Sequence, residues 1–210
     1  GAYTLTLNST AATTFAATVG NSAPLTAITT NSGGTVVFNT TAIETDGNQV
    51  YGENATLGGN ITFTTGGNDL TFSGTLNSVS STKTLDIVAG AGNTTFTGAV
   101  GGATNGDLGD TTIGTAVLTA AAIKVQGTLA ITNSGTSTIT GIISDGDTAA
   151  ILTKAGAGTL TLSGDNTYTG ATTVSAGVLA ITHADALGGT SGATTVADGA
   201  SLQLSNGINV

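Results

Sequence analysis

Short runs in which apolar and hydroxyl residues alternate recur along the whole chain. The run Thr159-Leu160-Thr161-Leu162 shows the pattern in its simplest form, with leucine at every second position. A period of two predicts a β-strand with one apolar and one hydroxylated face. We expect further strands over residues 3–7, 13–19, 25–29, 35–39, 55–57, 61–64, 70–72, 84–88 and 94–100. Because no segment keeps a helical period, the chain is predicted to be all-β.

Glycines separate these runs at regular places. The stretch from Lys154 to Leu179 reads as short strands joined by glycine corners, where the backbone turns sharply or takes a positive φ. A unit this short cannot bury its apolar face alone. It is therefore expected to stack on copies of itself above and below.

The same stretch resembles the autotransporter-associated β-strand repeat of bacterial autotransporter passenger domains. The residues that fit the family pattern are Gly156, Gly158, Thr159, Leu160, Leu162, Gly164, Asn166, Tyr168, Gly170, Thr172, Val174, Gly177 and Leu179. The resemblance implies a right-handed parallel β-helix that is exported to the bacterial cell surface. It implies no particular activity.

The preceding part of the chain carries a second resemblance. The run from Ala42 to Gly52, followed by the run from Ala55 to Phe63, is similar to repeats of filamentous-haemagglutinin-type exoproteins. That family implies the same architecture. We therefore expect one continuous β-helix over residues 1–210, with haemagglutinin-like coils over 1–150 and autotransporter-repeat coils over 151–210. At about 20 residues a coil, it has roughly ten coils; a β-sandwich with antiparallel hairpins is the alternative fold.

Three pairs of segments suggest a long internal repeat. Residues 13–20 align with 94–101 and residues 35–43 align with 115–123, at offsets of 81 and 80. Residues 70–78 align with 137–145, at an offset of 67. The pattern predicts a repeat of about 80 residues, or about four coils, whose second copy has lost part of a coil.

Composition supports stacking and excludes several classes of partner. Only 7% of the residues are charged, and the net charge is −9 with three lysines and no arginine. In stacked coils a repeated charge forms a like-charge column, whereas threonine, asparagine, serine and glycine stack without that cost. Nothing here neutralises a row of phosphates, so nucleic acid and anionic lipid are excluded as partners. The absence of cysteine fits a reduced compartment or an exported protein without disulfides, and no apolar run is long enough to span a membrane.

Carboxylates are the first candidates for chemistry, because β-helix enzymes that cut polysaccharides use two or three of them. Most adjoin glycines or turns, where aspartate usually bonds its own backbone, so we expect no catalytic site. Calcium binding stays open for Asp107, Asp110, Asp145 and Asp147, although the EF-hand spacing is absent. The carboxylates considered are Glu44, Asp46, Asp86, Asp107, Asp110, Asp145 and Asp147.

The remaining candidates also have structural interpretations. His183 is the one histidine and is expected in a surface loop, and with no cysteine beside it we expect neither a metal site nor a cofactor. The run Gly90-Ala91-Gly92 is interpreted as a coil corner. Tyr51 and Tyr168 sit near turns and are expected to lie against the coil surface. The phenylalanines are expected to stack inside the solenoid: Phe15, Phe38, Phe63, Phe72 and Phe96.

These observations predict a structural or adhesive rod of a bacterial secreted or surface protein, and no enzyme. A β-helix polysaccharide lyase or hydrolase is one alternative, and an inert exported scaffold that displays another domain is the other. The expected ligand is a host, neighbouring-cell or matrix surface. The strands at residues 3–7 and 201–204 lack the charges or proline that protect an edge. The chain is therefore expected either to continue at both ends or to stack end to end into fibres.

Overall fold

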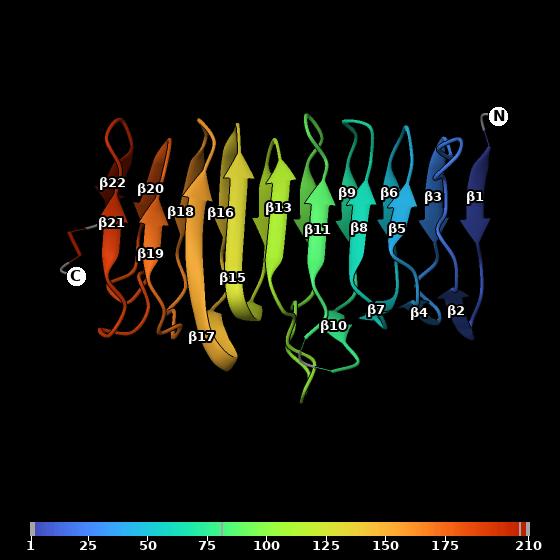
Figure 1. Ribbon diagram of the computed structural model, residues 1–210, viewed down its shortest axis with the longest axis horizontal. Coiled ribbons are helices and arrows are strands. Elements are labelled where there is room, and N and C mark those ends of the chain that lie inside the picture. The colour runs from blue at the N-terminus through green and yellow to red at the C-terminus, as the bar shows by residue number, and fades with distance from the viewer. Residues whose placement is uncertain (1–2, 81, 206, 209–210) are drawn as a thin grey trace.

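The computed structural model describes residues 3–80, 82–205 and 207–208, and it shows an elongated solenoid (Figure 1). Within these residues every named element is a β-strand and there is no helix. The two ends of the chain lie at opposite ends of the solenoid (Figure 1). The predicted limits of the rod at Gly1 and Val210 lie outside the described residues.

The strands form three parallel sheets along the axis of the solenoid. The ten-stranded sheet contains β1 (Thr4–Leu7), β3 (Ala27–Thr30), β6 (Gln49–Tyr51), β9 (Leu70–Phe72), β12 (Thr94–Phe96), β14 (Leu118–Ala120), β16 (Thr136–Ile139), β18 (Thr159–Leu162), β20 (Val178–Ile181) and β22 (Ser201–Leu204). The four-stranded sheet contains β2 (Ala12–Phe15), β4 (Thr35–Phe38), β7 (Asn54–Leu57) and β10 (Leu76–Ser78).

The eight-stranded sheet covers the third side. It contains β5 (Ala42–Glu44), β8 (Ile61–Thr64), β11 (Leu85–Val88), β13 (Thr111–Thr115), β15 (Ile123–Asn133), β17 (Ile143–Ala155), β19 (Thr172–Val174) and β21 (Thr194–Val196). The two long strands β15 and β17 also continue the column of the four-stranded sheet, because Val100 bridges Leu76 of β10 to Ile123 of β15. The β15–β17 pairing has a register shift between Val125 and Gly127. After β17, the described coils have strands in two sheets only, the ten-stranded and the eight-stranded.

Every strand pairing is parallel, which confirms the predicted β-helix and removes the β-sandwich with its antiparallel hairpins. In Figure 1 the eight-stranded sheet faces the viewer and its strands run upward, while the ten-stranded sheet behind runs downward. The chain advances from right to left, so the coil is right-handed. The solenoid makes about nine turns. Coil length varies along the rod. Leu70 pairs with Thr94 of the next coil, whereas Thr119 pairs with Thr138, which follows it by fewer residues.

The proposed long internal repeat does not correspond to a structural repeat. Its first alignment pairs β2 with β12, and its second brings Phe38 of β4 onto Leu118 of β14; in both cases the strands belong to different sheets. The third alignment pairs β9 with β16, which lie in the same sheet three strands apart. The offset of that alignment is therefore three coils. The Thr-Thr-Phe pattern misled the alignment because any inward-facing strand of this solenoid can carry it.

The core is one continuous column of apolar side chains inside the coil. The five phenylalanines lie inside as predicted, since none is more than 6% exposed. They stack with one another in the first half of the rod; the ring centroids of Phe15 and Phe38 lie 5.4 Å apart, and those of Phe72 and Phe96 lie 5.5 Å apart. Each such pair adds about 1 kcal/mol beyond burial of its area.

The surface position predicted for Tyr51 and Tyr168 is wrong, because both side chains are fully buried. The Tyr51 ring packs between Phe38 and Phe72, and its hydroxyl donates to Gln49 Oε1 at 3.0 Å. The Tyr168 hydroxyl lies 2.6 Å from Thr172 Oγ1. A buried polar partner satisfies each phenol, so the inward position costs little.

Alkaline pH is expected to destabilise the fold through its two buried tyrosines. Burial raises the pKa of Tyr51 well above its ordinary value, and it also raises the pKa of Tyr168, whereas Tyr3 is 72% exposed. Since the folded state favours the neutral phenols, their contribution to stability is intact below about pH 10 and is lost as pH rises further. We expect the phenolate absorbance of Tyr51 and Tyr168 to appear only as the fold is lost. Phenolate absorbance from either residue while circular dichroism still shows folded protein contradicts this, and the Tyr3→Phe variant leaves these two phenols as the source of the signal.

Candidate functional site

The stretch from Lys154 to Leu179 forms slightly more than one coil, and its apolar residues point inward. Leu160, Leu162, Tyr168, Val174 and Leu179 all have an exposed fraction of 0%. In the parallel register Leu160 pairs with Leu179 and Leu162 pairs with Ile181, so each leucine stacks on an apolar residue of the next coil. The alternation of threonine and leucine thus produces one outer hydroxyl face and one inner apolar face.

Asn166 connects three successive coils through its side-chain amide. Its Oδ1 accepts a hydrogen bond from the Ile143 N–H of the preceding coil at 2.7 Å. Its Nδ2 donates to the Ala186 carbonyl of the following coil at 2.6 Å, and its own backbone N–H donates to the Asp185 carbonyl at 3.1 Å. The amide is 3% exposed. It therefore satisfies two backbone groups that water cannot reach.

Asn166→Ala is expected to lower the free energy of unfolding by about 2–3 kcal/mol, because it leaves a buried N–H and a buried carbonyl without partners. Asn166→Asp is expected to be similarly harmful, since a carboxylate accepts from Ile143 but cannot donate to Ala186. Chemical denaturation followed by circular dichroism measures both. The matched control is Asn48→Ala, because the exposed Asn48 Oδ1 accepts one hydrogen bond from the described residues, that of the Asp69 N–H. Equal losses at the two positions would contradict the bridging role.

The comparisons with known proteins give a result for this same stretch. Residues 152–181 match the model of the passenger-associated-transport-repeat family, and we call these residues the transport repeat. The match supports the predicted autotransporter resemblance and indicates export to the cell surface or the extracellular space. The resemblance of the preceding coils to filamentous-haemagglutinin-type repeats stays a prediction. No curated protein and no solved structure matches the chain.

Lys154 stands near the start of the transport repeat, in an inward column that is otherwise apolar. It pairs with Ile131 on one side and Val174 on the other, and its side chain is fully buried. The ammonium donates to three backbone carbonyls, those of Ala155 at 2.7 Å, Gly156 at 2.9 Å and Ala176 at 3.2 Å. Burial lowers the pKa of Lys154. The lysine thus closes a coil corner from the inside.

Two of the acidic candidates, Asp110 and Asp145, make contacts between coils. Asp110 Oδ1 accepts from the Thr128 N–H at 2.7 Å. Asp145 Oδ1 accepts from Ala150 and Thr169 at 2.7 and 3.0 Å. The expected bonds to their own turns are in part replaced by bonds to the backbone of the neighbouring coil. Coil stacking brings these N–H groups to the corner, which turn chemistry alone does not predict.

Two of the other acidic candidates lie on the eight-stranded sheet without being neighbours. Glu44 lies in β5 and Asp86 in β11, with β8 between them in the sheet. Asp107 does approach the Asp145-Gly146-Asp147 segment of β17, because its carboxylate lies against the Gly146 backbone. Both Asp107 oxygens are buried without a hydrogen-bond donor from the described part of the protein. Calcium binding at these aspartates stays a prediction.

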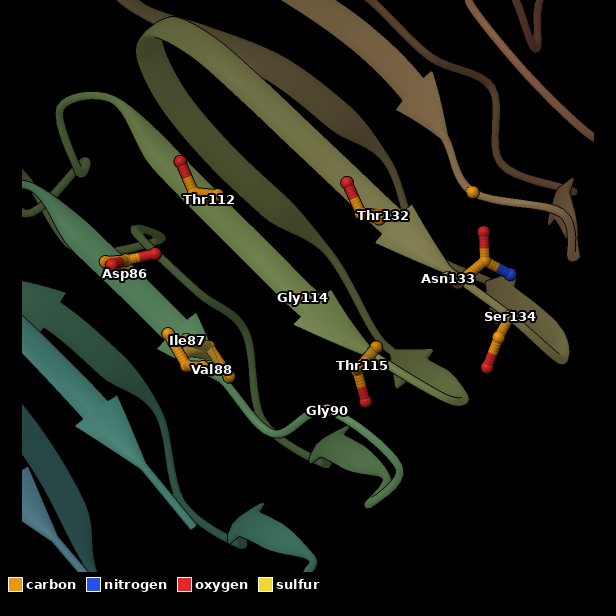
Figure 2. A pocket seen from close by; sticks show the side chains of 11 residues that line it. Asp86, Ile87, Val88, Gly90, Thr112, Gly114, Thr115, Thr132, Asn133 and Ser134 are labelled. Atoms are coloured by element: carbon orange, nitrogen blue, oxygen red, sulfur yellow. The ribbon is translucent and has the colours of Figure 1, made fainter. Parts of the chain in front are cut away.

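A shallow groove of about 360 Å³ lies on the outer face of the eight-stranded sheet (Figure 2). Its floor includes Val88 and Gly114, and Thr132 stands beside them. Val88 pairs with Gly114 and Gly114 with Thr132, so the hollow exists because one residue of the column has no side chain. Asp86 is the one ionisable residue among those that line it. The groove therefore offers an apolar notch rather than an acid–base pair.

The ten-stranded sheet carries the most regular outer surface of the rod. A column of threonines occupies equivalent outward positions in successive coils, interrupted once by Val50. Its members are Thr6, Thr29, Thr71, Thr95, Thr119, Thr138 and Thr161. We call this set the threonine column. Neighbouring strands lie about 4.8 Å apart, so the column is an evenly spaced, uncharged row of hydroxyl and methyl groups.

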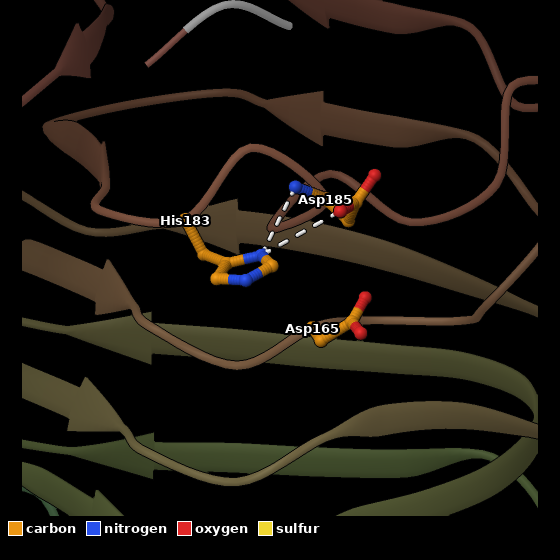
Figure 3. A group of neighbouring side chains, drawn as sticks. All are labelled: Asp165, His183 and Asp185. Atoms are coloured by element: carbon orange, nitrogen blue, oxygen red, sulfur yellow. Dashed lines mark hydrogen bonds and ion pairs between the residues drawn. The ribbon is translucent and has the colours of Figure 1, made fainter. Parts of the chain in front are cut away.

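Sequence reasoning missed one group of side chains, at the corner after β18 and the turn after β20. One ligand-type atom from each of Asp165, His183 and Asp185 lies within 4.8 Å of the others (Figure 3). His183 Nδ1 accepts from the Asp185 N–H at 3.1 Å and lies 3.8 Å from Asp185 Oδ2. Asp165 precedes His183 by most of a coil, so only the coil stacking brings it to them.

The described residues include no helix long and apolar enough to cross a membrane.

Proposed function

We propose that this chain is an adhesive, non-enzymatic rod segment of a bacterial passenger protein. The observation that carries the proposal is the combination of an uninterrupted β-solenoid of about nine turns with a transport repeat inside it. A single apolar core runs through the turns, and strand pairing fixes each coil on the next. Such a body suits the task of holding contact sites at a distance from the cell.

The threonine column supports contact with a neutral, hydroxylated surface such as a cell-surface or matrix glycan. Its hydroxyls donate and accept hydrogen bonds, and its methyl groups offer apolar contact. The net charge of −9 and the scarcity of lysine favour a neutral partner over an acidic one. The separation of Glu44 from Asp86 supports a binding rather than a hydrolytic role.

The adhesive role is tested by display of the chain on a bacterial surface and measurement of binding to glycan-coated beads. We expect Thr29→Lys/Thr71→Lys/Thr119→Lys to reduce binding at least tenfold. These residues lie in alternate coils, so the lysines do not form a like-charge column. The matched control is Thr62→Lys/Thr112→Lys/Thr153→Lys, which places three lysines in alternate coils of the eight-stranded sheet. Equal binding by both variants and by the wild type would refute the proposed face.

A second arm separates adhesion from simple spacing. In it, an unrelated β-solenoid of the same number of turns replaces the whole chain. Loss of binding is expected if these coils carry the contact. Retained binding would show that the chain is an inert spacer, which is the scaffold alternative.

Fibre assembly is the further part of the proposal. The strands β1 and β22 are the outer members of the ten-stranded sheet and have one partner each. Either can pair with one more coil, from the same polypeptide or from another copy. Sedimentation and electron microscopy over a concentration series test this; we expect particles that lengthen with concentration. Particles of constant length at high concentration would exclude assembly between copies.

A further inference from the structure

We propose that Asp165, His183 and Asp185 form a binding site for a divalent transition-metal ion, with Zn²⁺ as the preferred ion. The group combines one imidazole with two carboxylates, and these ligand atoms lie within 4.8 Å of one another. Imidazole and carboxylate together suit zinc, whereas calcium prefers oxygen ligands alone. The three side chains converge on one space between two coil corners (Figure 3).

The charges around the group favour a bound cation. Asp165 and Asp185 are exposed, and two carboxylates held this close repel each other. Among the described residues, the one basic group within ion-pair distance of either carboxylate is the imidazole of His183. The chain has no arginine and three lysines, of which Lys154 is bound to backbone carbonyls at another corner. A divalent ion would neutralise the pair without a lysine.

The backbone holds the two corners in place before any ion binds. The Asn166 N–H donates to the Asp185 carbonyl, and the Asn166 amide donates to Ala186. These bonds fix the residue after Asp165 against the turn that carries Asp185. The site is therefore built on two packed coils rather than on a free loop.

Zinc binding requires only a small movement of the three side chains. Ligands at about 2.1 Å from a tetrahedral zinc ion lie about 3.4 Å apart. Since the ligand atoms lie within 4.8 Å of one another, each pair must close by no more than roughly 1.4 Å. Their side chains are partly exposed and can rotate: 41% of His183 and 64% of Asp185 are accessible. If His183 binds through Nδ1, the ion replaces the hydrogen bond that the Asp185 N–H now makes. Three protein ligands leave one position for water.

Binding would join the coil of β18 to the coil of β20. Asp165 belongs to the first of these coils, and His183 and Asp185 follow the second. An ion that binds only the folded chain stabilises it in proportion to the logarithm of its concentration. The predicted consequence is a zinc-dependent reinforcement of the part of the rod that has strands in two sheets only.

The test is titration of the metal-free chain with zinc chloride, followed by calorimetry and by nuclear magnetic resonance of the imidazole. Because the chain has one histidine, its ring signals report this site alone. We expect one zinc ion per chain, a shift of the His183 ring signals, and a rise in the melting temperature of about 5 °C at a hundredfold excess over Kd. Asp165→Asn and His183→Gln are each expected to weaken binding at least tenfold.

Two controls keep the result specific. Asp147→Asn removes one exposed carboxylate at a different corner and is expected to bind zinc as the wild type does. Calcium chloride is expected to leave the His183 signals unchanged. The proposal is overturned if zinc at millimolar concentration leaves those signals in place, or if Asp165→Asn and His183→Gln bind as tightly as the wild type. Circular dichroism of each variant shows that the coil is intact.

Discussion

Replacing Gly177 by alanine is expected to lower the free energy of unfolding by about 3–4 kcal/mol. Gly177 has a φ of +69°, a conformation that costs other residues roughly 1–2 kcal/mol. In addition, an added Cβ would overlap the carbonyl oxygens of Gly156 and Gly158 in the preceding coil. Because those atoms belong to the backbone, relief requires the two coils to separate, at a further cost of about 2 kcal/mol. Chemical denaturation followed by circular dichroism measures the loss.

Substitutions at two other glycines separate the cost of the positive φ from the cost of the contact between coils. Gly199 has a φ of +78° with nothing within 4 Å of an added Cβ, so Gly199→Ala tests backbone conformation alone. Gly158 lacks a positive φ, but an added Cβ would overlap the Gly135 carbonyl, so Gly158→Ala tests coil contact alone. We expect Gly199→Ala to cost about 1 kcal/mol. A loss for Gly177→Ala no larger than this would show that coil spacing does not depend on glycine at that corner.

Lys154→Ala is expected to produce the second large loss, about 4 kcal/mol. The substitution removes a buried side chain and leaves a cavity, and it leaves the carbonyls of Ala155, Gly156 and Ala176 without their ammonium donor. Hydrogen exchange of the transport repeat should accelerate, because solenoid coils can open locally. The control Lys154→Met keeps most of the stem volume and is expected to lose about 2 kcal/mol. Equal losses for the two variants would mean that hydrogen bonding rather than volume decides.

Lys154 is expected to make the free energy of unfolding depend on pH in a definite direction. Burial lowers its pKa in the folded state, so the unfolded chain binds this proton more tightly. Stability is therefore expected to rise with pH between the lowered pKa and the ordinary value of about 10.5. The rise should appear below about pH 10, before the buried tyrosines begin to oppose it. The Lys154→Met variant should lack it.

The architecture was predictable because its physical cause is local. Alternation of threonine and leucine at residues 159–162 sets the two faces of a strand, and glycines set the corners. The low charge content then favours in-register stacking over a sandwich. The side facing inward also followed from the period of two, which is why the phenylalanines were placed correctly.

The errors arose where position depends on neighbouring coils. Tyr51 looked like a turn residue, but Gln49 supplies an internal partner for its hydroxyl. The long internal repeat failed because coil length varies along the rod while strand pairing stays in register. An alignment at a fixed offset therefore drifts from one sheet to another.

The candidate site was hidden for the same reason. Asp165 and His183 are far apart in the chain and belong to no local motif, and only the spacing of one particular coil brings them together. Because coil length varies, the sequence separation of residues that meet in neighbouring coils cannot be predicted without the strand register. A signal existed nonetheless, since the Asn166 position of the repeat fixes the corner beside Asp165.

The loss of the third sheet after β17 has a consequence under tension. Strand hydrogen bonds in a solenoid point along its axis, so a pull on the two ends loads the coil interfaces in series and each bears the full force. The interfaces between β18 and β20 and between β20 and β22 belong to coils with strands on two sides instead of three. Strand pairing therefore shares the load on two sides there instead of three. Under axial force these coils should unfold first. The coils of the first half, which contain the stacked phenylalanines, should stay folded while they do.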